Sequence, residues 1–155
     1  MKLKDLKKEI PFKWRVQSIK DWGADCVAYI DARDVQDLLD EVCFPDGWQC
    51  KYSEHKGNLF CSIGIWNSKD KTWTWKSDCG TESNVEKQKG EASDAFKRAA
   101  VMWGVGRFLY SKTIIRLDVV KDKRGKNVPA FNGKALYGDK ITDACNYKSD
   151  QLKKK

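Results

Sequence analysis

Residues 80–104 read GTESNVEKQKGEASDAFKRAAVMWG, and the rest of the predicted fold is organised around them. Four of their apolar residues recur at the spacing of one side of an α-helix. These are Ala92, Phe96, Ala99 and Trp103. The pattern predicts a long helix whose apolar stripe covers a hydrophobic core, with Lys97 and Arg98 flanking that stripe.

Both ends of this helix carry signals of their own. Ser83 and Glu86 have the spacing of a capping box, in which each side chain bonds to a backbone N–H of the first turn. The helix is therefore expected to begin near Asn84. Gly104 and Gly106 follow the apolar stripe, where glycine commonly ends a helix. Because they do not precede a helix, they do not predict a phosphate-binding loop.

Alternation of apolar and polar residues, typical of β-strands, marks much of the remaining chain. Strands are predicted at residues 12–19, 26–31, 48–52, 59–65, 73–78 and 113–120, and a short helix at 34–42. Polar turns at 56–58 and 67–71 join three strands that lead into the long helix. We therefore expect an α+β fold in which an antiparallel three-stranded β-meander precedes a long central helix, with extra strands towards the N- and C-termini.

Length and charge set the expected organisation. A chain of 155 residues corresponds to about one domain. We expect a polar segment at 1–11, the domain at 12–137, and a basic, partly disordered tail at 138–155. The net charge of +8 resides in the lysine-rich segments 1–9, 121–127 and 148–155, which favours a polyanionic partner.

The six cysteines show no Cys-x-x-Cys pair, and His55 is the one histidine. This composition predicts neither a structural metal nor another cofactor, and it favours buried, reduced thiols over disulfides. The N-terminal residues lack the apolar stretch of a signal peptide, and no segment is apolar enough to span a bilayer. We expect a cytoplasmic protein with no membrane partner.

Catalysis is not expected. His55 lies in a predicted turn, and the chain has no nucleophile elbow. The one alternative is a metal-dependent nuclease that uses carboxylates, for which the candidates are Asp118, Glu82, Glu86 and Glu91. Acidic residues on a helix are far more often solvated surface groups, so we predict that the protein is not an enzyme.

Two segments carry a family resemblance. Residues 92–100, ASDAFKRAA, are followed by an aromatic residue and Gly104, and residues 28–35, AYIDARDV, lead through the short helix to Gly47 and Trp48. Both resemble segments of the Rad-fifty-two family, and the chain is most similar to its compact Sak-like bacteriophage and DdrA-like bacterial members. The resemblance extends over roughly residues 10–120.

The resemblance implies a single-strand annealing recombinase core over 12–137. It further implies ATP-independent binding of single-stranded DNA and annealing of complementary strands during homologous recombination and double-strand break repair. The implied assembly is a homo-oligomeric ring, as in bacteriophage recombinases, in the cytoplasm of a bacterial or phage-infected cell. Double-stranded DNA, a single-strand-binding protein and an exonuclease are further candidate partners.

Lys97 and Arg98 match the pair with which the family grips the DNA backbone, so the resemblance makes them the leading DNA-binding candidates. The structural alternative is an exposed helix face on which Asp94 pairs with Arg98 at i, i+4, an interaction that stabilises a helix by only about 0.2–0.5 kcal/mol. The sequence leaves both interpretations open.

Two positions depart from the family's pattern. Val101 and Asp34 stand where the resemblance expects arginines, and Arg33 is a candidate substitute for the second of them. The other residues that could rebuild the groove are Lys76, Lys89 and Arg107.

Single strands are also held by stacking of bases on aromatic rings. Trp66 and Trp73, beside the polar turn at 67–71, are the candidate stacking residues, although most tryptophans in a domain of this size are core. A secondary DNA contact is predicted at Lys121, Lys123, Arg124 and Lys126, with the terminal lysines 153–155 as a looser addition. A solvated basic loop and tail is the competing interpretation.

Three alternatives to annealing remain. The first is protection of single-stranded DNA ends without annealing. The second is the nuclease described above, which loss of DNA sensitive to EDTA would reveal. The third is binding of structured RNA, which competition between RNA and DNA of equal length would distinguish.

Overall fold

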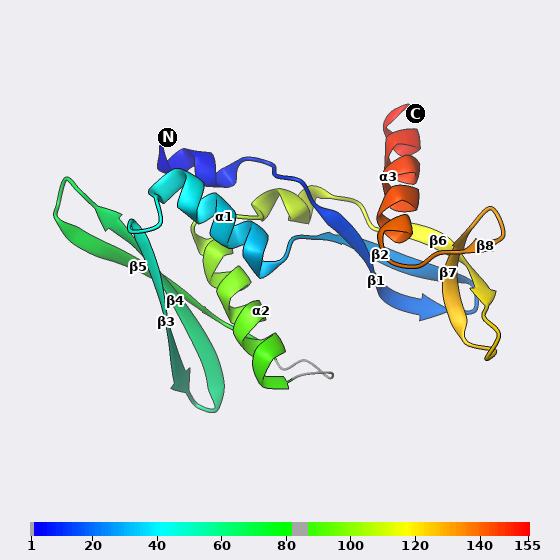
Figure 1. Ribbon diagram of the computed structural model, residues 1–155, viewed down its shortest axis with the longest axis horizontal. Coiled ribbons are helices and arrows are strands. Elements are labelled where there is room, and N and C mark those ends of the chain that lie inside the picture. The colour runs from blue at the N-terminus through cyan, green and yellow to red at the C-terminus, as the bar shows by residue number, and fades with distance from the viewer. Residues whose placement is uncertain (1, 82–86) are drawn as a thin grey trace. The chain divides into compact units, whose positions relative to one another are not determined.

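The computed structural model describes residues 2–81 and 87–155, with the backbone alone for 87–89 (Figure 1). The predicted capping box and helix start, at Ser83, Asn84 and Glu86, lie outside the described residues. The chain forms two compact units, where the sequence predicted one domain over 12–137. Unit 1 contains Met1–Ile10 and Ile30–Tyr110, and unit 2 contains Pro11–Tyr29 and Ser111–Lys155.

Unit 1 contains a three-stranded antiparallel sheet in the order β3-β4-β5. Its strands are β3 (Trp48–His55), β4 (Asn58–Asn67) and β5 (Thr72–Cys79). Lys56 and Gly57 make the β3–β4 turn with positive φ angles of 53° and 77°. On β4, the alternate residues Cys61, Ile63 and Ile65 are buried, as their period of two predicted.

The helix α2 (Lys87–Met102) lies against β4 and β5. Ala95, Phe96, Ala99 and Ala100 are buried on it, which confirms a core-facing stripe. Trp103 lies just beyond the last helical residue and donates its indole N–H to the Ile63 carbonyl oxygen at 3.0 Å. Gly104 and Gly106 follow with φ angles of 107° and 81°, so the chain turns where glycine is favoured.

The helix α1 (Ala32–Cys43) buries Val35, Leu38, Leu39 and Val42, at the spacing the sequence predicted. A 3₁₀ helix, η1 (Leu3–Lys7), contacts α1. Residues 1–11 were expected to be a polar segment, but Leu6 is fully buried. A single apolar residue therefore anchors the segment, and an ion pair between Lys8 and Glu41 at 2.7 Å adds to the contact.

Unit 2 contains a sheet in the order β1-β2-β6-β7-β8, with antiparallel pairs throughout. Its strands are β1 (Lys13–Lys20), β2 (Gly23–Tyr29), β6 (Ile115–Lys121), β7 (Asn127–Phe131) and β8 (Lys134–Ala135). The strands predicted at 12–19, 26–31 and 113–120 correspond to β1, β2 and β6 with small shifts at their ends. The α+β class with antiparallel sheets is confirmed.

The prediction of a partly disordered tail over 138–155 is wrong, because Asp139–Lys153 form the helix α3. Ala144 and Cys145 of α3 are buried in a core with Trp14, Cys26 and Leu117. The Trp14 indole N–H donates to Asn146 Oδ1 at 2.9 Å. The buried residues of this helix are small, which makes its helical stripe weak in the sequence although it is sufficient to dock the helix.

All six cysteines are free, and Cys26, Cys61 and Cys145 are buried. Burial raises the pKa of Cys61 to about 12, so its thiol stays protonated at neutral pH. No helix in the described ranges has both the length and the apolar character needed to cross a membrane.

Candidate nucleic-acid interface

Arg98 lies on the exposed side of α2 and pairs with Asp94. Its Nε donates to Asp94 Oδ2 at 3.0 Å, which is the i, i+4 ion pair considered as the structural alternative. Asp94 also accepts from the backbone N–H and the hydroxyl of Thr81, at 2.9 and 3.1 Å. Since a guanidinium has five N–H donors, a bond through Nε fixes Arg98 without using its full capacity for phosphate.

The carboxylate of Asp94 is held in its charged form. Burial by itself raises the pKa of Asp94, but the bonds from Thr81 and the guanidinium of Arg98 outweigh it and leave the pKa below its ordinary value. The pair therefore persists at neutral pH. Because Thr81 also holds the Asp94 carboxylate in place, Asp94 fixes the orientation of the Arg98 guanidinium in addition to balancing its charge.

Lys97 connects α2 to the start of α1. It is half-buried, and its Nζ donates to the carbonyl oxygen of Ile30 at 3.4 Å. Ile30 stands just before the first turn of α1, in which Arg33 is exposed. The structure therefore brings Lys97 close to the helix end that carries Arg33, two of the predicted DNA-binding residues.

Asp34, where the resemblance expected an arginine, caps α1. Its carboxylate accepts from the Asp31 backbone N–H at 2.9 Å, and the Asp31 carboxylate accepts from the Asp34 N–H at 3.0 Å. This reciprocal arrangement is a capping box. The departure at position 34 therefore has a structural reason, because an arginine cannot accept these bonds.

We expect Asp34→Ala to destabilise the protein by about 1 kcal/mol, since it removes one half of the capping box. Denaturant unfolding monitored by circular dichroism would measure the change. Asp37→Ala, an exposed substitution on the same helix, is the matched control and should change stability by less than about 0.5 kcal/mol. Equal stability of the two variants would contradict the structural role of Asp34.

Lys76 and Arg107 converge on the C-terminal end of α2. Lys76 Nζ donates to the Met102 carbonyl oxygen at 3.4 Å and lies 4.8 Å from the centre of the Trp103 ring. Arg107 donates to the carbonyl oxygens of Val101 and Met102 at 2.8 and 2.9 Å. Both cations satisfy helix-end carbonyls and complement the negative end of the helix dipole. Arg107 thereby carries positive charge to the turn at which Val101 replaces the expected arginine.

Tyr110 is an exposed aromatic residue near this helix end that the sequence did not single out. It is 77% exposed and belongs to the 3₁₀ helix η2 (Arg107–Ser111). The hydrogen bond and charge of Asp94 raise the pKa of Arg98, and the charges of Asp78 and Tyr110 add smaller contributions in the same direction. Proteins that bind single strands commonly combine exposed aromatic rings with cations, so Tyr110 is a candidate for base stacking. In the sequence, Tyr110 is one of several aromatic residues that follow Gly106, and nothing in the sequence distinguishes it from the others.

Trp66 and Trp73, the predicted stacking residues, lie on the face of the sheet opposite to α2. They are paired across β4 and β5, and their rings meet edge to face at 5.4 Å. Trp75 adjoins Trp73, and Lys51 lies over the Trp75 ring at 4.6 Å. The structure therefore does not bring these tryptophans together with Lys97 and Arg98. Lys89 lies on the described backbone of α2, and its side chain is outside the described atoms.

The predicted secondary contact belongs to the β6–β7 hairpin of unit 2. Lys121 ends β6 and donates to Asp21 at 3.2 Å. Lys123, Arg124 and Lys126 are exposed in the turn. The loop predicted at 121–127 is a hairpin turn over 122–126, because Lys121 ends β6 and Asn127 begins β7.

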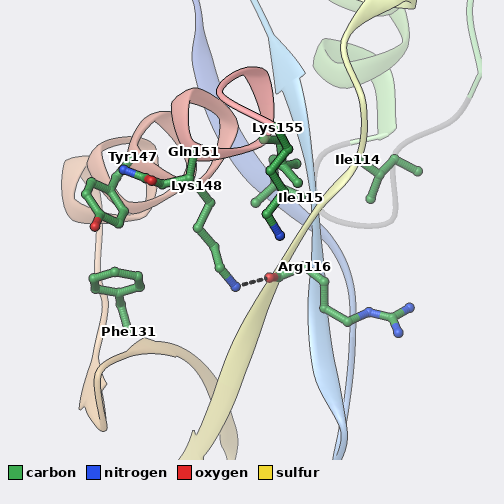
Figure 2. Close-up of a pocket in the computed structure, with 9 residues that line it drawn as sticks. Ile114, Ile115, Arg116, Phe131, Tyr147, Lys148, Gln151 and Lys155 are labelled. Atoms are coloured by element: carbon green, nitrogen blue, oxygen red, sulfur yellow. Dashed lines mark hydrogen bonds between the residues drawn. The ribbon is translucent and has the colours of Figure 1, made fainter.

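A separate hollow of about 360 Å³ lies beside α3 in unit 2 (Figure 2). Three of its lining residues are the cations Arg116, Lys148 and Lys155. Arg116 pairs with Asp25 at 2.8 Å, and Lys148 Nζ donates to the Arg116 carbonyl oxygen at 2.7 Å. Two of the three cations are thus already engaged, and most of the lining is apolar.

Of the candidate nuclease carboxylates, only Glu91 and Asp118 are among the described residues, and they belong to different units. Among the described residues, no group of three or more His, Cys, Asp or Glu side chains could hold a metal ion. Glu91 accepts from the Leu59 backbone N–H at 3.2 Å, and Asp118 is exposed on β6 of unit 2. Glu82 and Glu86 lie outside the described residues. His55 ends β3, where its ring contacts Ser53 and Phe60.

Known proteins share much of this sequence. A family model described as Rad52/22 family double-strand break repair protein matches residues 1–127. The chain is similar to the single-stranded DNA-binding protein DdrA of Deinococcus deserti, with 37% identity over 121 residues covering 71% of this chain and 59% of the relative. DdrA of Deinococcus radiodurans is 34% identical over 129 residues, covering 71% and 57%. The chain thus spans less than two thirds of the length of these relatives, and no solved structure matches.

Proposed function

Because the chain belongs to the Rad52/22 family of double-strand break repair proteins, we propose that it binds single-stranded DNA and anneals complementary strands. The reaction is ATP-independent and serves recombination and repair. Pairing itself is driven by the bases, so the protein contributes by holding strands extended and raising their encounter rate. No covalent bond is made or broken, and no cofactor is needed.

The observation that carries this proposal is the row of cations along α2. Lys97 and Arg98 lie one turn before the carbonyls that Lys76 and Arg107 contact, and Tyr110 is exposed on η2, which follows this helix. Cations spaced along a helix can follow a phosphate backbone, and contacts to phosphate carry no sequence preference. Such contacts leave the bases of the bound strand available for pairing.

The proposed assembly is a homo-oligomeric ring. Its support is the pair of edges that each sheet leaves open: β3 and β5 in unit 1, and β1 and β8 in unit 2. Residues 50–55 of β3 are exposed along their length. Long exposed edge strands are commonly covered by a neighbouring subunit, and head-to-tail contacts of this kind close into rings.

End protection without annealing is the second candidate. It is favoured by the names of both Deinococcus relatives, which describe binding of single-stranded DNA. Binding of this kind needs the same cations and the same exposed ring. The two functions differ only in whether the bound strand presents its bases to a complement.

The deciding experiment is the rate at which two complementary fluorescent oligonucleotides pair with and without the protein, in EDTA and without nucleotide. We expect a rate increase that reaches its maximum when protein covers the strands. Tight binding without acceleration would instead establish end protection. Failure to bind single strands would overturn both candidates. The chelator excludes a metal-dependent nuclease as the source of any change.

A further inference from the structure

Trp22 is the most exposed tryptophan in the described part of the chain. It forms the β1–β2 turn together with Asp21, and 72% of its surface is accessible. Its ring makes no aromatic or cation–π contact with another described residue. An indole that is neither packed nor stacked is rare, since most tryptophans bury much of their surface.

The neighbouring β6–β7 hairpin presents three cations that have no acidic partner. Lys123, Arg124 and Lys126 make no ion pair with any other described residue. Asp122 is the one acid of the turn, and its carboxylate accepts from the backbone N–H groups of Arg124 and Lys126 at 2.8 and 2.9 Å. The acid therefore shapes the turn, while the basic side chains point outward.

Asp21 fastens the Trp22 turn to this hairpin. Its carboxylate accepts from Asn127 Nδ2 at 2.8 Å and from Lys121 Nζ at 3.2 Å, at the two residues where β7 begins and β6 ends. Asn127 and Lys121 also hold the pKa of Asp21 below its ordinary value. In Figure 1 the β1–β2 and β6–β7 turns lie at the same end of the sheet. The two turns are thus adjacent, and their exposed side chains define what is here called the hairpin surface: Trp22, Lys123, Arg124 and Lys126.

We propose that the hairpin surface is a second site for single-stranded DNA, in which Trp22 stacks on a base and the three cations contact phosphates. The inference extends the proposed function to unit 2 and rests on it for the identity of the ligand. Lys121, whose ammonium is used by Asp21, belongs to the support of the surface and not to its contacts.

Single-stranded DNA fits this surface better than a duplex or a protein. A duplex offers phosphates, but its bases are already stacked, so it would leave Trp22 without a partner. An acidic protein segment would use the cations, but a lone indole is a small apolar surface compared with the core of a protein interface. A flexible strand satisfies both requirements, because each unpaired base has a face available for stacking.

The test compares Trp22→Ala, Trp22→Phe and the triple variant K123A/R124A/K126A with the parent protein, using fluorescein-labelled thymidine 30-mers at several salt concentrations. We expect Trp22→Ala to weaken binding about fivefold with an unchanged salt slope, since stacking releases no counterions. Trp22→Phe should recover most of the affinity. The triple variant should lower the slope by about 0.7 for each phosphate that is no longer neutralised.

The outcomes separate this inference from the proposed function. If K97A/R98A weakens binding while Trp22→Ala and the triple variant leave affinity and slope intact, the second site is refuted and the proposed function stands. If only the hairpin variants weaken binding, the second site stands and the assignment of Lys97 and Arg98 fails. Loss of duplex binding alone in the triple variant would refute the stacking role. A changed assembly mass of Trp22→Ala in sedimentation would assign the surface to subunit contact instead.

Discussion

Replacement of Lys97 and Arg98 by alanine together is expected to weaken binding of single-stranded DNA about 25-fold at 0.1 M salt. Each phosphate of a single strand that the protein neutralises releases about 0.7 counterion, so removing two such cations lowers the slope of log K against log salt by about 1.4. Taken from 1 M salt, where log salt is zero, to 0.1 M salt, a slope difference of 1.4 changes the affinity by about 1.4 log units, which is about 25-fold. Titration of a labelled thymidine 30-mer at several salt concentrations would measure both quantities.

The matched control removes two exposed lysines elsewhere. K134A/K140A deletes the same net charge in unit 2, where both side chains are exposed. Its slope should stay close to that of the parent protein. If the two double variants lose equal affinity, the loss reflects total charge. Lys97 and Arg98 would then not be a specific DNA contact, and Arg98 would serve only in its surface ion pair with Asp94. Thermal unfolding would establish that each variant remains folded.

The second large effect is expected for Tyr110→Ala. Stacking of a base on an aromatic ring contributes about 1–3 kcal/mol, so the variant should bind single strands roughly 5- to 150-fold more weakly. The salt slope should not change, because the phenol carries no charge. Stability should change little, since the ring is mostly exposed.

Tyr110→Phe separates stacking from hydrogen bonding. The variant keeps the ring and removes the hydroxyl, so it should bind like the parent protein. If Phe and Ala weaken binding equally, the hydroxyl and not the ring is the active group. If neither weakens it, Tyr110 is not part of the site. Competition with a duplex of equal length would show whether the ring prefers unpaired bases.

Helices and strands with a strong apolar period could be predicted from the sequence. Elements with few or small buried residues could not. The stripe through Phe96 and the alternation through Ile63 and Ile65 predicted α2 and β4, because both patterns arise from a large buried surface. The helix α3 was missed because its buried residues, Ala144 and Cys145, are small. Leu6 was missed for a related reason, since one apolar residue has no period.

The site residues divide in the same way. Lys97 and Arg98 were candidates because of the family resemblance, whereas the Asp31 and Asp34 capping box is a local spacing that the sequence analysis did not use. Tyr110 could not be ranked as a stacking candidate either, because the exposure of its ring is a property of the folded chain. Exposure also reordered the tryptophans, because Trp66 meets Trp73 across two strands while Trp22 stands alone.

The bond between Lys97 and the Ile30 carbonyl has a thermodynamic consequence. Without DNA this ammonium already has an acceptor, and Arg107 likewise has the carbonyls of Val101 and Met102. Where a phosphate takes over one of these N–H groups, it replaces one acceptor with another, so the net gain from that bond is smaller than for a donor without an acceptor. What remains is the entropy of the released ions. Under the proposed function, each contact would be weak and many together strong, so a strand that has paired with its complement would leave stepwise.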